Sequence, residues 1–182
     1  MASAGRDERA WVRGARAGSA SDLEALFRAH WPRAYRAAYL VVQDASAAED
    51  IAQEAFLAAV RALDTFDRRR PFGPWLHRIV VNRAIDWARA RALRREVGDD
   101  DAVAAAPAPE SGNPGRPLSG HVVAGLASLS PEHRAVIVLR YLLEYTPGEI
   151  AELLDLPRGT VNSRLRRGLD ALTERISLED LS

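Results

Sequence analysis

Residues 146–167 read TPGEIAELLDLPRGTVNSRLRR, and this stretch decides the fold expected for the C-terminal part of the chain. Thr146 can cap a helix, and Glu149 can reach back to it and complete a capping box. Residues 156–159 (LPRG) break that helix, and Thr160 is placed to cap a second one. The stretch therefore predicts two helices joined by a tight turn.

The second of these helices has an apolar face and a basic, polar face. Its apolar residues Val161, Leu165, Leu169 and Leu172 recur at helical spacing and should be buried. Such burial would leave five polar residues facing outward near the start of the helix: Arg158, Asn162, Ser163, Arg166 and Arg167. A recognition helix presents side chains of this kind to bases and phosphates in a major groove. An ordinary helical hairpin with a solvated basic face has the same spacing, so both interpretations stay open.

The charge of the chain is balanced overall but strongly segregated. Its 25 basic and 25 acidic residues cancel, yet residues 61–95 hold ten Arg against three Asp, and residues 96–110 hold five acids and no base. Local fields therefore matter more than the total, and neutrality does not exclude binding to nucleic acid. The absence of Cys excludes a disulfide framework and a thiolate metal site. No apolar run approaches the roughly 20 residues of a membrane span, so we expect a soluble, cytoplasmic protein without metal or cofactor.

Residues 1–96 read as a series of helices. Capping boxes at Ser21 and Ser46 each open a helix, with Phe27 on the core face of the first, which Pro32 should kink or end. The helix after Ser46 carries an outer side at three- and four-residue spacing, made of Asp50, Gln53, Glu54 and Leu57. Such a side is usually only solvated, but it also suits docking of a basic partner helix.

A basic segment follows. Residues 64–74 contain three consecutive arginines beside Pro and Gly, which predicts a loop. A long helix is expected over residues 75–95, with Trp75 and Trp87 on its inner, buried stripe. Cations interleaved with aromatic rings suit single-stranded or melted nucleic acid, because phosphates attract the cations and unstacked bases need ring faces.

Residues 97–118 (VGDDDAVAAAPAPESGNPGRPL) predict a linker. They hold four Pro, three Gly and five Ala but almost no large apolar side chain. Such a segment cannot bury enough surface to offset the entropy of ordering, so we expect it to be extended and flexible.

Helices are expected again beyond the linker, over residues 122–129 and 130–143, the second with Ser130 as its cap. The sequence has no strand pattern and no internal repeat. We therefore predict an all-α protein with two small helical domains, residues 1–96 and 119–182, joined by the flexible linker.

Several of these segments together resemble the extracytoplasmic-function sigma factors, the small two-domain initiation subunits of bacterial RNA polymerase. Residues 50–56 (DIAQEAF) are similar to the family's region 2.2, and residues 72–86 (FGPWLHRIVVNRAID) to its regions 2.3 and 2.4. Residues 129–165 look like region 4. In this order, with a linker of this length, the motifs are highly specific, and the likeness covers nearly the whole chain.

The resemblance implies a transcription initiation factor that binds core RNA polymerase and directs it to promoter DNA. It assigns docking on the polymerase clamp helices to Asp50, Gln53, Glu54 and Leu57. It assigns recognition and melting of the minus-ten element to Arg68, Arg69, Arg70, Phe72, Arg78, Asn82, Arg83 and Arg89, with a flipped base captured by the loop at residues 67–71. It assigns reading of the minus-thirty-five element to Arg158, Thr160, Asn162, Ser163, Arg166 and Arg167, next to a contact with the polymerase flap.

Further expectations come with the family. Its linker runs through the active-site cleft and RNA exit channel of the polymerase, and many members are held inactive by an anti-sigma protein, which we expect as a partner. Asn162 departs from the family, which usually places Lys or Arg there, and Arg166 lies at a variable position. The promoter sequence cannot therefore be copied from a relative.

Two other classes of function remain as alternatives. An autonomous helix-turn-helix regulator normally dimerises to span two half-sites, and the sequence shows no heptad seam for a dimer. A pure protein-interaction module would leave the arginine-rich face between Arg68 and Arg95 without a role. Catalysis is not expected, because the four His are scattered and no glycine-rich phosphate loop is present.

Overall fold

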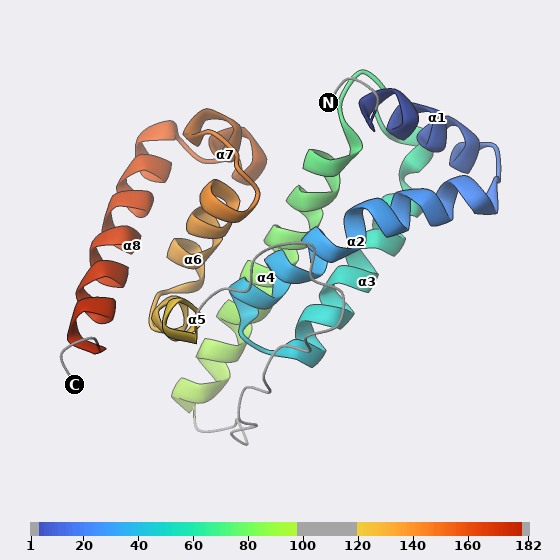
Figure 1. The fold of residues 1–182 in the computed structure, drawn as a ribbon. Coiled ribbons are helices and arrows are strands. Elements are labelled where there is room, and N and C mark those ends of the chain that lie inside the picture. Colours follow the sequence, from blue (N-terminus) through green and yellow to red (C-terminus); the bar gives the residue numbers. More distant parts are fainter. Residues whose placement is uncertain (1–3, 98–119, 180–182) are drawn as a thin grey trace.

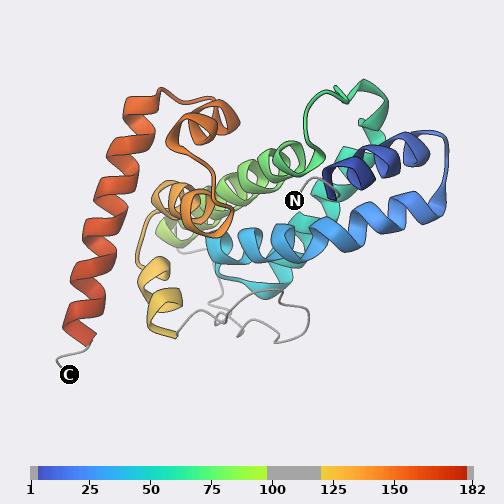
Figure 2. The ribbon, with the colours of Figure 1, turned by 45° about the horizontal axis from the view of Figure 1, so that its top comes forward.

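The computed structural model describes residues 4–97 and 120–179, and every regular element within them is a helix. These residues form two bundles, seen from two directions in Figures 1 and 2. The all-α fold is confirmed, whereas residues 98–118 of the predicted linker lie outside the described residues. Within the two described ranges, no helix has both the length and the apolar character needed to cross a membrane.

The first bundle comprises residues 4–97. Its elements are α1 (Ala4–Arg16), α2 (Ala20–Val42), α3 (Ala45–Arg61), a short 3-10 turn (Leu63–Thr65) and α4 (Phe72–Val97). α2 contacts each of the other three α-helices and so organises the bundle (Figure 1). Alanines at the helix contacts are fully buried, which lets the helix axes approach closely; among them are Ala34, Ala38, Ala48 and Ala55.

Two helices of this bundle begin at caps other than the predicted ones. Ser19, not Ser21, caps α2, and its hydroxyl accepts a hydrogen bond from the backbone N–H three residues on, at 3.3 Å. Asp44, not Ser46, caps α3 in the same way, at 3.0 Å. Serine and aspartate are about equally good caps. The Asp44 carboxylate also binds Arg91 of α4 at 2.7 Å, and this tertiary contact favours it.

Pro32 was expected either to kink α2 or to end it, and it does not end the helix. The helix runs from Ala20 to Val42 with Pro32 inside it. An interior proline costs roughly 3 kcal/mol because a backbone hydrogen bond is lost. Seven residues beyond it are buried in the core, and burial of this apolar surface outweighs the local cost: Ala34, Ala37, Ala38, Tyr39, Leu40, Val41 and Val42.

An aromatic cluster fixes the start of α4. The helix begins at Phe72, three residues before the predicted start. The Phe72 ring centroid lies 6.0 Å from that of Phe66 and 5.7 Å from that of Trp75, and its backbone N–H donates to the Glu8 carboxylate of α1 at 2.8 Å. Trp75 and Trp87 pack against the core, as predicted.

The second bundle comprises residues 120–179. Its elements are α5 (Gly120–Ala127), α6 (Pro131–Ile137), a π-helical continuation (Val138–Leu142), α7 (Pro147–Leu154) and α8 (Arg158–Glu179). The predicted capping box of α7 is present. The Glu149 carboxylate accepts from the Thr146 N–H at 2.7 Å, and the Thr146 hydroxyl accepts from the Glu149 N–H at 3.3 Å.

The turn between α7 and α8 differs in detail from the prediction. α8 begins at Arg158, so Thr160 lies in its first turn and does not cap it. The Pro157 carbonyl accepts the first helical bond instead, from the Val161 N–H at 3.2 Å. Asp155 ends α7 in the left-handed conformation (φ 54°), which Asp tolerates better than most residues.

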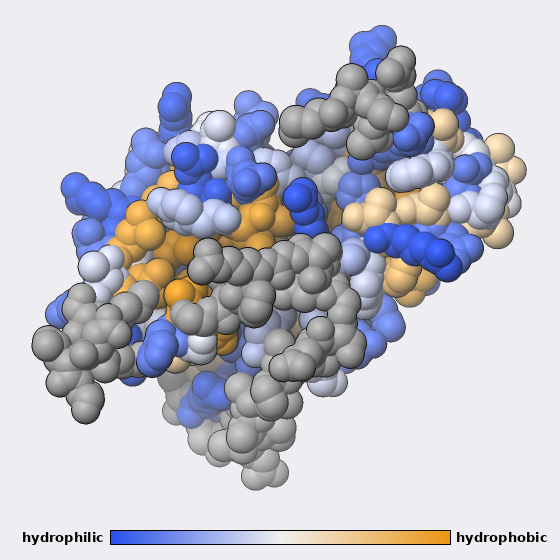
Figure 3. All heavy atoms as spheres, in the orientation of Figure 1, coloured by the Kyte–Doolittle hydropathy of each residue, from blue (hydrophilic) through white to orange (hydrophobic). Residues whose placement is uncertain are grey.

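α8 packs closely against α6. A Cβ atom at Gly168 would lie only 2.8 Å from the terminal methyl of Ile137, so a larger residue there would force that methyl to shift. Val161 and Leu165 are buried, and Leu169 and Leu172 are half-buried. The predicted apolar face of α8 is thus confirmed. Figure 3 shows apolar side chains gathered between α8 and its neighbours, whereas hydrophilic side chains cover the outer side of α8.

The two bundles also pack against each other. α6 lies against α2 and α4, and α7 lies against α4. Polar contacts cross between them: Arg134 Nη1 donates to the Val41 carbonyl at 2.6 Å, His77 Nδ1 and the Tyr145 hydroxyl lie 2.7 Å apart, and Arg89 Nε donates to Glu132 at 2.5 Å.

Candidate protein and nucleic-acid interfaces

The predicted docking residues share the exposed side of α3. The four side chains are all exposed, and Leu57 is 54% exposed although it is apolar. The opposite side of the helix is buried, which turns these residues outward. Glu54 forms an ion pair with Arg83 of α4 at 2.8 Å. The surface formed by Asp50, Gln53, Glu54 and Leu57 is therefore both acidic and apolar. Such a surface suits the binding of a basic amphipathic helix.

An apolar groove of about 460 Å³ adjoins this surface, between α2 and α3. Leu23 and Phe27 of α2 line one side, and Phe56, Leu57 and Val60 of α3 line the other. The sequence pattern placed Phe27 in the core, but it is 37% exposed. Helical periodicity cannot distinguish a residue buried in the core from one that borders a groove.

The predicted minus-ten residues do not form a single surface. Arg68, Arg69 and Arg70 are exposed in the loop before α4, where the Asp67 carboxylate accepts from the Arg69 N–H at 3.0 Å. Phe72, in contrast, is only 1% exposed and belongs to the core.

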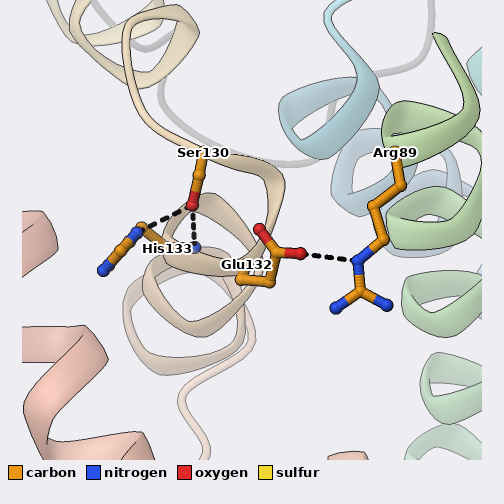
Figure 4. A network of polar contacts seen from close by, with 4 residues as sticks. All are labelled: Arg89, Ser130, Glu132 and His133. Atoms are coloured by element: carbon orange, nitrogen blue, oxygen red, sulfur yellow. Dashed lines mark hydrogen bonds and ion pairs between the residues drawn. The ribbon is translucent and has the colours of Figure 1, made fainter. Parts of the chain in front are cut away.

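On α4 the predicted residues differ in their availability. Arg78 is exposed and Asn82 is half-buried. Arg83 is paired with Glu54, and Arg89 is paired with Glu132 of the second bundle. Figure 4 shows Arg89 reaching from α4 toward Glu132 at the start of α6, where Ser130 caps the helix. The ion pair thus joins a predicted DNA-binding arginine to the other bundle.

A buried histidine and a tyrosine form a second contact between the bundles. His77 of α4 is 5% exposed, and its Nδ1 lies 2.7 Å from the hydroxyl of Tyr145, just before α7. Burial lowers the pKa of His77 from 6.5 to about 3, and His30 and Arg33 nearby contribute in the same direction. Burial also raises the pKa of the Tyr145 hydroxyl, so both groups are neutral. The sequence signalled neither partner.

The stability of the protein should therefore fall as the pH is lowered below 6.5. The unfolded chain binds a proton on residue 77 near pH 6.5, whereas the folded chain does so only near pH 3. The unfolded state consequently gains protons over this range, at up to about 1.4 kcal/mol per pH unit. Urea unfolding of the wild type and of His77→Asn at pH 6.5 and 5.0 measures the effect. The neutral variant should lose less stability on acidification, and equal losses would contradict the assignment to His77.

The predicted minus-thirty-five residues lie along the outer side of α8, near its start. Arg158, Asn162, Arg166 and Arg167 are exposed, and Thr160 and Ser163 are half-buried. The arrangement of α7, the turn and α8 is that of a helix-turn-helix whose second helix presents a basic polar face.

Comparison with known proteins identifies both bundles. The family described as "Sigma-70 region 2" matches residues 26–94, and the family described as "Sigma-70, region 4" matches residues 125–174. The ECF RNA polymerase sigma factor SigL of Mycobacterium tuberculosis (strain ATCC 25618 / H37Rv) is 36% identical over 180 residues, covering 93% of this chain and 96% of SigL.

Two solved structures have a similar fold. CnrH, determined in complex with the cytosolic domain of CnrY, is 28% identical and has a TM-score of 0.68 over 97% of this chain and 99% of CnrH. The sigma factor RpoE of Bartonella quintana, determined with the anti-sigma factor NepR, is 24% identical and has a TM-score of 0.69 over 86% of this chain and 97% of RpoE.

Proposed function

The chain belongs to the extracytoplasmic-function sigma factors, and we propose that it binds core RNA polymerase through α3 and directs it to promoters through α4 and α8. One observation supports the DNA-binding part above all. The apolar face of α8 is buried in its own bundle, so its basic polar face is left free near the start of the helix, at Arg158, Asn162, Arg166 and Arg167.

The docking part of the proposal rests on α3. Its acidic residues attract a basic clamp helix, and Leu57 and the adjoining groove provide an apolar surface against which that helix can pack. The protein adds no catalysis of its own and acts in the cytoplasm, where the polymerase acts. Residues 1–96 and 119–182 form its two working domains, and the segment between them threads the polymerase.

The two bundles separate when the protein binds both promoter elements. The minus-ten and minus-thirty-five elements lie about 25 base pairs apart, or roughly 85 Å at about 3.4 Å per base pair. In this structure the two bundles contact each other, and Arg89 forms an ion pair with Glu132. Both elements can be read together only after these contacts break. An anti-sigma protein that held the two bundles together would keep this protein inactive; RpoE was determined in complex with an anti-sigma factor.

Run-off transcription with purified core polymerase tests the proposed function. The protein should be required for transcripts from its own promoters. A self-sufficient regulator would instead bind those promoters tightly without polymerase and only modulate transcription by another initiation factor.

Replacing Arg166 or Arg167 with Ala should lower promoter use roughly five- to hundredfold, because one phosphate or base contact is worth about 1–3 kcal/mol. Binding to core polymerase should not change. Arg175→Ala is the matched control, since this exposed arginine lies further along α8. Run-off transcription and polymerase co-elution together check the result. Normal transcription by both variants would show that these residues of α8 do not take part in promoter recognition.

A further inference from the structure

Helix α1 contacts both ends of the segment that carries the basic loop before α4. Glu8, Val12 and Arg16 recur at four-residue spacing, so they share one face of the helix. Val12, in the middle, is 3% exposed and belongs to the core. The charged residues on either side of it bind the two ends of the segment at residues 64–72, so α1 bridges the loop.

Arg16 binds the first end of this segment. Its Nη2 donates to the Asp64 carbonyl at 2.9 Å, and its Nε lies 3.5 Å from the Asp64 carboxylate. The arginine side chain is only 28% exposed. A planar guanidinium that contacts two acceptors of one residue fixes the orientation of that residue as well as its position. The chain is thereby fixed two residues before Phe66, whose ring is buried.

Glu8 binds the second end. One of its carboxylate oxygens accepts from the Phe72 N–H at 2.8 Å, and the other lies 3.0 Å from His30 Nε2 of α2. Phe72 is the first residue of α4, so its N–H has no carbonyl partner within the helix. The hydrogen bond from His30 lowers the pKa of Glu8, and the Phe72 N–H contributes in the same direction. An ionised Glu8 thus joins α1, α2 and α4 at one point.

Between these two contacts the loop exposes three arginines, at residues 68–70. A turn shapes its tip: the Asp67 carboxylate accepts from the Arg69 N–H at 3.0 Å, and the Asp67 carbonyl accepts from the Arg70 N–H at 3.0 Å. Ordering the backbone of a loop costs free energy, and the contacts with α1 offset that cost before any DNA is bound. A loop that is already ordered binds an unpaired strand more readily than one that must be ordered on binding.

We propose that α1 is a positioning element for promoter opening, in which Glu8 and Arg16 hold the arginine loop in the conformation that receives the unpaired minus-ten strand. The two residues act through the loop and not by touching the DNA. Both lie outside residues 26–94, which match the region 2 family. The inference rests on the proposed function and on the expected contact of the loop arginines with that strand.

The test compares Glu8→Ala and Arg16→Ala with the wild type, each in complex with core polymerase and a double-stranded promoter. Permanganate reactivity of unpaired thymines should show that each variant opens the promoter roughly tenfold more slowly. Co-elution with core polymerase should stay normal. A helix that only stabilised the fold would instead lower polymerase binding and promoter opening together.

Conservative variants at the same positions should restore most of the opening rate. Glu8→Gln keeps an acceptor for the Phe72 N–H. Arg16→Lys keeps a donor for the Asp64 carbonyl. Asp7→Ala removes an exposed carboxylate beside Glu8 and is the matched control, which should open the promoter at the wild-type rate.

The mobility of the loop gives a second readout. The chain has no Cys, so Arg69→Cys accepts a single nitroxide label at the tip of the loop. The electron paramagnetic resonance spectrum of the labelled full-length protein should sharpen when Glu8→Ala or Arg16→Ala is added, because the tip then moves faster on the nanosecond timescale. Adding Asp7→Ala should leave the spectrum unchanged.

The outcomes separate this inference from the proposed function. Opening at the wild-type rate by both alanine variants would overturn the positioning role and leave the proposed function standing. Slow opening with an unchanged spectrum, or with loss of polymerase binding, would overturn it as well, since the residues would then not act through the loop. If the wild type with core polymerase opens no promoter, the proposed function fails and the role of α1 fails with it.

Discussion

Replacing both Asp50 and Glu54 with Arg should abolish co-elution of the protein with core RNA polymerase. Both carboxylates lie on the exposed side of α3, so the fold should hardly change. Reversing two charges turns attraction to a basic clamp helix into repulsion, which costs several kcal/mol. Affinity should then fall by two or more orders of magnitude, as measured by size-exclusion chromatography with core enzyme.

The ion pair between Glu54 and Arg83 requires its own control. An exposed pair contributes about 0–1 kcal/mol, so Arg83→Ala should leave polymerase binding nearly intact. Asp170→Arg combined with Glu174→Arg repeats the charge reversal at the same spacing on α8, and should still co-elute. Normal co-elution of the α3 variant would show that another surface docks on the polymerase.

Phe72→Ala should lower the free energy of unfolding by about 3–5 kcal/mol, the usual cost of removing a large core aromatic side chain. The ring is 1% exposed and lies against Phe56, Phe66 and Trp75. Total stabilities of domains are only about 5–15 kcal/mol, so the loss is large. Urea unfolding measures it.

A conservative variant distinguishes a core role from the predicted contact with DNA. Phe72→Leu keeps most of the apolar volume and should cost much less stability than Phe72→Ala. Arg70→Ala, on the nearby exposed loop, should change stability by less than about 0.5 kcal/mol. A change below about 1 kcal/mol in Phe72→Ala, with a loss of promoter opening, would restore the direct DNA role.

The sequence by itself determined the features that depend on neighbours a few residues apart. The capping box of α7 and the cap of α6 were predicted correctly, because each joins residues separated by three positions. The buried and exposed sides of α3 and α8 followed from helical periodicity, and with them the candidate docking and minus-thirty-five surfaces. The close approach of α8 to α6 at Gly168 was not predicted, because it depends on the helix that packs against it.

The tertiary structure alone decided the features that join distant residues. Arg91 favours Asp44 as the cap of α3 from 47 positions away, and Glu8 fixes the start of α4 from 64 positions away. His77 meets Tyr145 across 68 positions, and Arg89 meets Glu132 across 43. No local pattern encodes such pairs, because they exist only once the helices pack. The ion pairs of Arg83 and Arg89 on α4 arise from the same packing.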